Sequence, residues 1–166
     1  AGAAGLRVSD GVVVDDEQRT SDQSIFAVGD VATRLDGEKK TPIRIESWAN
    51  AIESARIAAS VIANEPPPSR QTPWFWTDQC GINIQIVGDI HGPKQVIQRG
   101  SDEHFCQLYF QDGSLKGAVS VDAGKDMSVL RRMLDRGLEI TPEQAADEST
   151  ALRDLLKRSP RRLRSG

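Results

Sequence analysis

The sequence is poor in the features that mark several common classes of protein. Its two cysteines, Cys80 and Cys106, stand 26 positions apart, with no CxxC pair and no Cys/His spacing of a metal site. No apolar run approaches a membrane span, and the first residues lack a charged segment followed by an apolar one. These absences argue against a redox-active cysteine pair, a metal centre and a membrane protein. They favour two reduced, partly buried thiols in a cytoplasmic chain.

Recognisable catalytic groups are equally scarce. No Gly-x-Gly-x-x-Gly occurs anywhere, so the usual cradle for a dinucleotide pyrophosphate is missing. His91 and His104 have no Ser, Cys or carboxylate at triad or ligand spacing, and we interpret both as surface residues. The acidic residues 15–17 are interpreted as a solvated turn. We therefore predict no catalytic side chain, and we expect the chain to be a fragment of a longer protein.

Charge is unevenly distributed along the chain. The net charge is −3, but basic residues gather between Arg153 and Gly166, where Asp154 is the only acid. Such a tail is either a solvated, unordered terminus or an attractant for an acidic partner. The acidic body has no basic surface interleaved with aromatic residues, so nucleic-acid binding is not expected.

The most informative stretch is residues 24–32. Residues 25–28 form a short, continuous apolar run, which predicts a strand buried on both faces of a parallel sheet. Gly29 would let the backbone approach a ligand, and Asp30 would place a carboxylate at the carboxyl end of that strand, where α/β sheets bind ligands. The alternative for Asp30 is a helix N-cap.

Four motifs in the same order give this stretch a context. The chain resembles the C-terminal part of FAD-dependent, NAD(P)H-linked ferredoxin reductases that supply oxygenases, of the putidaredoxin-reductase-like family. The resemblance extends to about Leu156. The motifs are Asp-Glu-Gln-Arg-Thr-Ser at 16–21, Ser-Ile-Phe-Ala-Val-Gly-Asp at 24–30, Glu-Ser-Trp-x-Asn-Ala at 46–51 and Pro-Trp-Phe-Trp-Thr-Asp-Gln at 73–79.

The resemblance implies an activity, cofactors and partners. The intact parent would pass electrons from NAD(P)H through FAD to a [2Fe-2S] ferredoxin, and the basic tail could attract that ferredoxin. Partners would be the missing N-terminal FAD and NAD domains and further copies of the chain. Two departures from the family leave the electron partner open: Cys80 stands where a bulkier residue is commoner, and the tail after Ser159 matches nothing in the pattern.

The resemblance also implies which residues lie near the flavin. Gly29, Asp30 and Val31 would meet the cofactor, with Asp30 at the ribityl hydroxyls. Glu46, Ser47 and Trp48 would lie near the pyrimidine edge of the ring, where a helix N-terminus favours negative charge. Trp76 would pack beside the ring on the side where ferredoxin approaches. Core packing is the alternative role for Trp48 and Trp76.

The expected fold is α+β: an antiparallel sheet with helices, preceded by the C-terminal segment of an α/β FAD-binding domain. The predicted domains are residues 1–65, a proline-rich linker at 66–72, a reductase C-terminal domain at 73–158 and a basic tail at 159–166. The clearest helix is residues 47–63, capped by Ser47, with one apolar stripe. That stripe comprises Trp48, Ile52, Ala55, Ala59 and Ile62.

Shorter patterns complete the prediction. Asp112-Gly113 indicates a hairpin turn, Thr141-Pro142-Glu143-Gln144 a capping box, and Asp122 with Asp126 a helix cap. Further elements are a strand at 11–15, a loop at 34–41, strands at 82–87, 95–98, 105–110 and 115–121, and helices at 127–134 and 152–156.

The competing hypothesis is an interaction or dimerisation module whose N-terminal strands are a remnant. We expect the isolated chain to be colourless, because it lacks the phosphate loop. We also expect it to self-associate, because residues 25–28 would need strands from another molecule.

Overall fold

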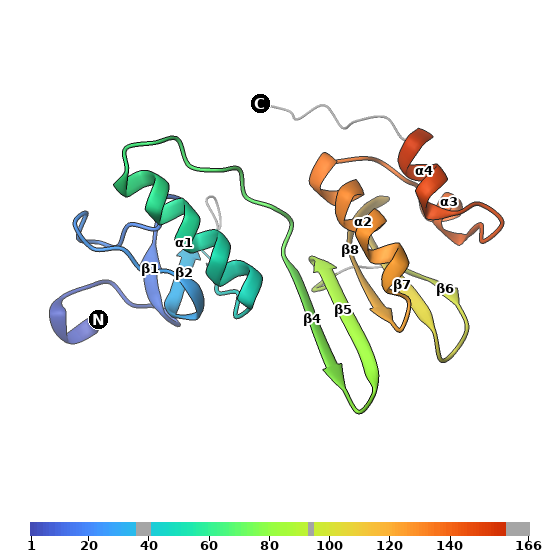
Figure 1. The fold of residues 1–166 in the computed structure, drawn as a ribbon, viewed down its shortest axis with the longest axis horizontal. Coiled ribbons are helices and arrows are strands. Elements are labelled where there is room, and N and C mark those ends of the chain that lie inside the picture. The colour runs from blue at the N-terminus through green and yellow to red at the C-terminus, as the bar shows by residue number, and fades with distance from the viewer. Residues whose placement is uncertain (36–40, 93–94, 159–166) are drawn as a thin grey trace. The chain divides into compact units, whose positions relative to one another are not determined.

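The chain forms two compact units, Ala1–Arg70 and Gln71–Gly166. The computed structural model describes residues 1–35, 41–92 and 95–158 (Figure 1). Within these ranges no helix is both long enough and apolar enough to cross a membrane. The mixture of an antiparallel sheet and helices confirms the α+β fold class. The predicted basic tail at 159–166 lies outside the described residues.

The first unit combines a small sheet with one long helix. Its strands lie in the order β1-β2-β3, with β1 parallel to β2 and β2 antiparallel to β3. The elements are η1 (Gly2–Ala4), β1 (Val12–Val14), η2 (Gly29–Val31), β2 (Ala32–Leu35), β3 (Pro42–Ile43) and α1 (Trp48–Ile62). The strand predicted at 11–15 is thus confirmed as β1. The loop predicted at 34–41 is wrong at Arg34 and Leu35, which belong to β2, and residues 36–40 lie outside the described part.

The predicted strand at residues 25–28 is wrong. Phe26 makes a single isolated bridge to Arg19, and the segment is otherwise irregular. Ile25 is 41% exposed and Val28 37% exposed, so the run is not buried on both faces. A strand inside a parallel sheet needs a neighbour on each side and a layer on each face. Among the described residues the run has a neighbour on one side only: the Thr20 amide donates to the Ile25 carbonyl at 2.9 Å and the Ala27 amide to the Gln18 carbonyl at 3.2 Å.

Helix α1 begins and ends where the sequence predicts, but it buries the other face. Ser47 is its N-cap and accepts a hydrogen bond from the Asn50 amide, at 3.2 Å. The buried positions are Ser54, Ile57 and Ala58. The predicted stripe is instead exposed at its large members: Trp48 at 68%, Ile52 at 38% and Ile62 at 67%. Both faces of α1 are therefore apolar, and this unit covers only one.

The second unit is a five-stranded antiparallel sheet covered on one face by helices. Its strand order is β4-β5-β8-β7-β6, which makes β4 and β6 the edges. Helix α2 packs across β5 and β8, as Figure 1 shows, and α4 packs on α2. The elements are β4 (Trp74–Gln79), β5 (Ile82–Gly88), β6 (Gln95–Gly100), β7 (Phe105–Gln111), β8 (Ser114–Val121), α2 (Gly124–Arg136), α3 (Pro142–Ala146) and α4 (Leu152–Arg158).

Local sequence signals explain most boundaries of this unit. Asp112 and Gly113 both have positive φ, at 49° and 73°, which is the conformation of a type I′ hairpin turn. Thr141 and Gln144 form the complete capping box, with Pro142 at the helix start. The strands and helices predicted between residues 82 and 156 are all present. The core lies between the sheet and α2, where Val87, Leu108, Phe110, Ala118, Met127, Leu130 and Met133 are buried.

One predicted cap is wrong. Helix α2 has Ala123 at its N-cap position, with no side-chain hydrogen bond to the helix. Asp122 instead accepts a hydrogen bond from the Asn83 amide at 2.8 Å and so ties the ends of β8 and β5 together. Asp126 lies inside the first turn of α2. Asp122 could accept a hydrogen bond either from a backbone amide at the start of α2 or from the Asn83 amide. The antiparallel pairing of β5 with β8 places the Asn83 amide beside it.

Candidate functional site

The turn η2 holds the first group of predicted site residues. Gly29 adopts φ 68°, in the left-handed region, and its amide donates to the Ser54 hydroxyl at 2.9 Å. A Cβ at Gly29 would lie 3.5 Å from the Ala51 Cβ, so η2 packs closely against the first turns of α1. Gly29 is favoured here for its left-handed conformation, whereas a Cβ would make only an ordinary contact with Ala51.

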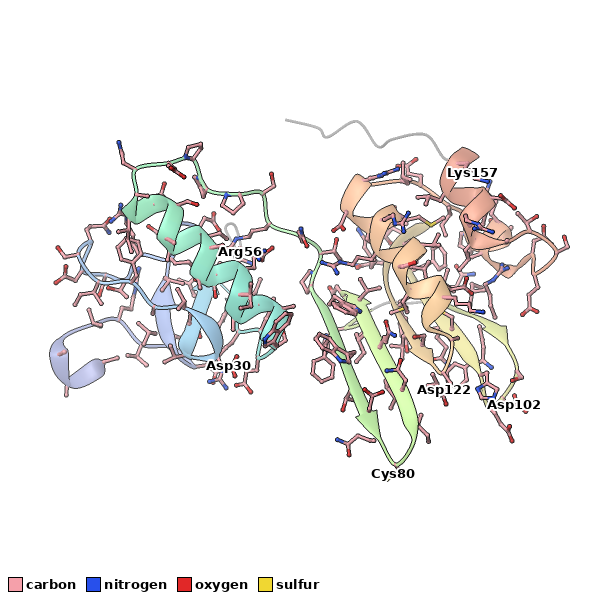
Figure 2. All side chains as sticks on the ribbon, viewed as in Figure 1. Asp30, Arg56, Cys80, Asp102, Asp122 and Lys157 are labelled. Atoms are coloured by element: carbon pink, nitrogen blue, oxygen red, sulfur yellow. The ribbon has the colours of Figure 1, made fainter. Side chains whose placement is uncertain are left out.

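Asp30 follows Gly29 and points away from the core. Asp30 is exposed, as is Val31, at 53%. Figure 2 shows where Asp30 lies in the first unit. Asp30 is inside η2, whose N-cap is Val28, so the alternative reading of Asp30 as an N-cap is wrong. Its carboxylate makes no hydrogen bond or ion pair with another residue that the structure describes, and it is available to ligand hydroxyls.

The second group of site residues opens helix α1. Asn50 ties the segment before the helix to its first turn, because its side-chain amide donates to the Ile45 carbonyl at 2.7 Å. Glu46 is paired with Arg44, with 2.6 Å between its Oε1 and the Arg44 Nη2. Trp48 follows the Ser47 cap with most of its indole exposed. The helix start therefore presents its positive dipole end beside an exposed aromatic surface.

These features fit a flavin better than a charged or metallic ligand. A flavin offers a flat aromatic ring and a chain of hydroxyl groups. Exposed Val31 and Trp48 supply apolar contact, and the Asp30 carboxylate supplies a hydrogen-bond acceptor, all from η2 and the start of α1. Among the described residues, no group of His, Cys, Asp and Glu could hold a metal ion.

Trp76 belongs to the second unit. It lies on β4, on the same sheet face as Trp74, and the two indoles are stacked with ring centroids 4.7 Å apart and an interplanar angle of 22°. Trp76 is 37% exposed, so it is neither a core residue nor a fully solvated one. The site residues therefore fall into two sets: six in the first unit and Trp76 in the second.

Sequence reasoning missed Ser54, which positions the first set. Ser54 is 2% exposed, accepts the Gly29 amide hydrogen and donates to the Asn50 carbonyl at 2.7 Å. This hydroxyl links η2 to the helix that starts at Ser47. A serine three and four positions from the apolar Ile57 and Ala58, on one helix face, was the available signal.

The histidines and cysteines remain outside the site. The His91 side chain is 95% exposed and that of His104 63%, each with one carboxylate nearby: Asp89 at 3.6 Å and Asp122 at 4.0 Å. Both cysteines are free. The expectation of two partly buried thiols is wrong for Cys80, which is exposed at the β4–β5 turn. Burial raises the pKa of the Cys106 thiol from 9.0 to about 12, with Asp126 adding to the rise.

A small hollow in the first unit lies apart from the predicted residues. Its polar lining includes Arg34, Arg70, Gln18 and Asn50. The guanidinium groups already have partners: Arg34 contacts the Asp16 carboxylate at 3.1 Å, and Arg70 donates to the Asp16 carbonyl at 3.0 Å. Burial, and then the charge of Arg34, lowers the pKa of Arg70. The hollow anchors the end of the unit and offers no unpaired charge to a ligand.

Two family models match the chain in succession. Residues 1–55 match the pyridine nucleotide-disulphide oxidoreductase family, and residues 74–156 match the family described as reductase C-terminal. Together they leave only the region around the proline-rich linker and the end of the chain unmatched. The family recognised from the four motifs is thereby confirmed.

The relatives point in the same direction. The chain is 36% identical to the ferredoxin–NAD(+) reductase component of the biphenyl dioxygenase system of Paraburkholderia xenovorans (strain LB400), covering 96% of this chain and 40% of that protein. Its fold matches the reductase in a covalent putidaredoxin reductase–putidaredoxin complex, with TM-score 0.87, 32% identity and coverage of 94% and 38%. It also matches the ferredoxin reductase for the CYP199A2 system of Rhodopseudomonas palustris, with TM-score 0.85, 37% identity and coverage of 92% and 38%. The chain thus spans about two fifths of each relative.

Proposed function

The chain belongs to the reductase C-terminal family, and from this we propose that it is the C-terminal part of an FAD-dependent NAD(P)H:ferredoxin reductase of an oxygenase system. In the intact parent, electrons from NAD(P)H reach a [2Fe-2S] ferredoxin by way of FAD. The three relatives that share 32–37% identity with the chain support this class: two are named ferredoxin reductases and the third a putidaredoxin reductase.

Bound FAD supplies the hydride and electron chemistry, and the side chains of this chain bind and orient it. Asp30 would accept hydrogen bonds from the ribityl hydroxyls, which a carboxylate does more strongly than a neutral acceptor. The N-terminus of α1, with Ser47 and Trp48, would favour negative charge at the ring edge. Glu46, paired with Arg44, would lie near this edge, and Trp76 would supply an aromatic contact to the ring.

One observation carries this assignment: the Ser54 side chain of helix α1 holds the Gly29–Asp30 turn against the helix by a hydrogen bond. The hydrogen bond from the Gly29 amide to the Ser54 hydroxyl, at 2.9 Å, fixes an outward carboxylate beside the start of a helix. A bare N-cap or a surface turn would not require a left-handed glycine packed against Ala51. A fixed, outward carboxylate beside a helix N-terminus is the arrangement that we expect of a ligand-binding turn.

We further propose that the parent's FAD and NAD domains cover the open apolar surfaces of the first unit. These surfaces are residues 25–28 and the stripe on α1. A helix that is apolar on two faces is normally buried on both. The relatives contain further polypeptide that this chain does not span, and it is the natural cover. Our domain assignment, with boundaries at residues 65, 72 and 158, is part of this proposal, and the two compact units support it.

The cellular setting is proposed on chemical grounds. Two free cysteines and the use of NAD(P)H favour the cytoplasm, where thiols stay reduced. The basic residues after Arg153 favour encounter with an acidic ferredoxin.

The runner-up function is an interaction module that dimerises through the same open apolar surfaces. The exposed Trp48, Ile52 and Ile62 favour it, because an uncovered apolar stripe also binds a second copy. The two functions differ in one respect: only the reductase part requires the Asp30 carboxylate.

The decisive experiment joins this chain to the polypeptide encoded upstream of Ala1 and measures its FAD content. We expect the upstream region to encode a strand followed by Gly-x-Gly-x-x-Gly and the joined protein to be yellow. Asp30→Asn should weaken FAD binding by about tenfold to a hundredfold, the worth of a charge-assisted hydrogen bond. Asp102→Asn, at an exposed loop of the second unit, is the matched control and should leave it unchanged.

Two results would contradict the proposal. One is an upstream region without the phosphate loop. The other is a joined protein whose FAD affinity is the same for Asp30→Asn and Asp102→Asn.

A further inference from the structure

The indole pair on β4 is part of a longer series of contacts. The Arg131 guanidinium of α2 lies over the Trp74 ring, with 5.1 Å between its Cζ and the ring centroid. Trp74 in turn stacks on Trp76 at 4.7 Å. The series runs from the helical layer to the edge strand, and it ends at the residue that we place beside the flavin.

Arg131 is itself held in place. Its Nη2 donates to the Gln71 side-chain oxygen at 2.6 Å, and its Nε lies 4.0 Å from the Asp135 carboxylate one helical turn away. Asp135 also accepts the Thr72 amide hydrogen at 2.8 Å. Helix α2 therefore fixes both the entry to β4 and the guanidinium above its first indole.

Trp74 also packs against the core of the second unit. β4 is an edge strand, and among the described residues it pairs only with β5, so no strand of this sheet lies along its outer side. A guanidinium over an aromatic face is attracted by the electron-rich ring, and this attraction selects one orientation of Trp74. Trp76 stacks on that orientation. Without the cation, both rings would sample rotamers that expose more of their surface.

We propose that Arg131 is a positioning residue for Trp76, acting through Trp74. This inference rests on the proposed function for its biological purpose, because it assigns the indole pair to a flavin. The geometric part of the inference concerns this chain alone: the Arg131 cation holds the Trp74 ring in the orientation on which Trp76 stacks. The sequence pattern alone gave no reason for a fixed orientation of the two indoles.

The test reads the indole pair directly, in the 166-residue chain without flavin. Two stacked indoles give an exciton couplet in the far-ultraviolet circular dichroism spectrum, and Trp74→Phe or Trp76→Phe should abolish it. Arg131→Met keeps the length of the side chain and removes the cation. We expect its couplet to fall about threefold, the population change that an exposed cation–π contact of this kind supports.

Two matched variants separate the cation from general packing. Arg131→Lys keeps a cation without the planar fork and should retain an intermediate couplet. Arg132→Met makes the same change at the next, exposed position of α2 and should leave the couplet unchanged. Equal couplets for Arg131→Met and Arg132→Met overturn the inference. So does an Arg131→Lys couplet no larger than that of Arg131→Met.

A parallel measurement in the joined, flavin-containing protein separates this inference from the proposed function. If Arg131→Met reduces the couplet and Trp76→Phe leaves the flavin fluorescence unchanged, Arg131 positions the pair but Trp76 is not at the flavin. If the flavin fluorescence responds to Trp76→Phe while Arg131→Met leaves the couplet intact, the proposed function stands and the role of Arg131 is overturned.

Discussion

Arg99 shows how a single buried charge can organise a whole segment. The residue is 8% exposed, and its guanidinium donates to the carbonyl oxygens of Ala145, Asp147 and Thr150 at 2.6–2.9 Å. These carbonyls lie at the end of α3 and in the loop that leads to α4. The cation thus satisfies three acceptors that would otherwise be poorly paired near the core.

We predict that Arg99→Met lowers the free energy of unfolding of the second unit by about 2–4 kcal/mol, because it leaves those three carbonyl oxygens without their hydrogen-bond donor. Urea unfolding monitored by circular dichroism measures the change. The control is Arg132→Met, which should stay within about 0.5 kcal/mol of the unaltered chain. Equal stability of the two variants would show that water replaces the guanidinium at no cost.

Cys106 makes the chain sensitive to alkaline pH. Burial raises the pKa of its thiol to about 12, against 9.0 when unburied, so the unfolded chain loses this proton first as the pH rises. The stabilising effect of the neutral thiol is complete below about pH 9 and disappears between about pH 9 and 12. We therefore expect stability to fall over this range, and to fall less in Cys106→Ala than in the unaltered chain. Parallel pH profiles for the two proteins would contradict this.

Residue-level signals predicted structure well wherever a side chain has a single backbone partner within a few positions. Thr141 formed its capping box and Asp112-Gly113 its turn, because both depend only on local geometry. Asp122 failed as a predicted cap because its partner, the Asn83 amide, is 39 positions away.

Two residues were missed for the same reason. Ser54 contacts Gly29, and Arg131 contacts Trp74, and in each case the partner is far away in the sequence.

At the scale of elements, helix α1 separates what periodicity can and cannot predict. The spacing of apolar residues gave its bounds and its cap, because helix formation depends on nearby residues. Two apolar stripes were available, however, and the sequence alone did not say which one this chain buries. The inner one contains Ile57, at 1% exposure, and the outer one contains Ile52, at 38%.

A pair of alanine substitutions on α1 tests this assignment. Ile57→Ala should lower the free energy of unfolding by about 3 kcal/mol, because it empties a packed site. Ile52→Ala should cost less than about 1 kcal/mol in the isolated chain, since much of its surface is already in water. Thermal or urea unfolding would measure both values. A larger loss at Ile52 than at Ile57 would show that the buried face is the reverse of the one described.

Residues 25–28 show the limit that applies to strands. A helix satisfies its own backbone, whereas a strand depends on neighbours that can lie anywhere in the chain or outside it. The apolar run at these positions has a local preference for an extended strand, but the strand that it predicted is absent. The prediction failed because only one bridge, from Phe26 to Arg19, is present among the described residues.

At the scale of the whole molecule, the two units differ in how well the sequence predicted them. All five described strands of the second sheet come from the second unit itself, so alternation and turn signals sufficed to outline β5 to β8. Residues 1–55 of the first unit match the pyridine nucleotide-disulphide oxidoreductase family, and Ile52 and Ile62 of this unit remain exposed. The family resemblance supplied what the physical pattern could not, namely the identity of the ligand that we propose.

This open surface leads to a prediction about the isolated chain in solution. Ile25 and Val28 with the α1 stripe form exposed apolar area that water solvates poorly. We expect the purified chain to be colourless and to self-associate as its concentration rises, which light scattering would detect. The double variant Ile52→Lys/Ile62→Lys should shift the chain toward monomer, because two cations resist burial in an apolar contact.

The control for that experiment is Arg56→Ala, at an exposed polar position of the same helix (Figure 2), which should leave self-association unchanged. A strictly monomeric chain at all concentrations would contradict the idea that these surfaces need a cover. If the double variant Ile52→Lys/Ile62→Lys self-associates as strongly as the unaltered chain, the contact is not on α1. It would then lie at residues 25–28 or at an edge strand such as β6. If the stripe on α1 is the contact, the joined protein should be monomeric at concentrations where the isolated chain is not, because the parent's own domains then occupy the stripe.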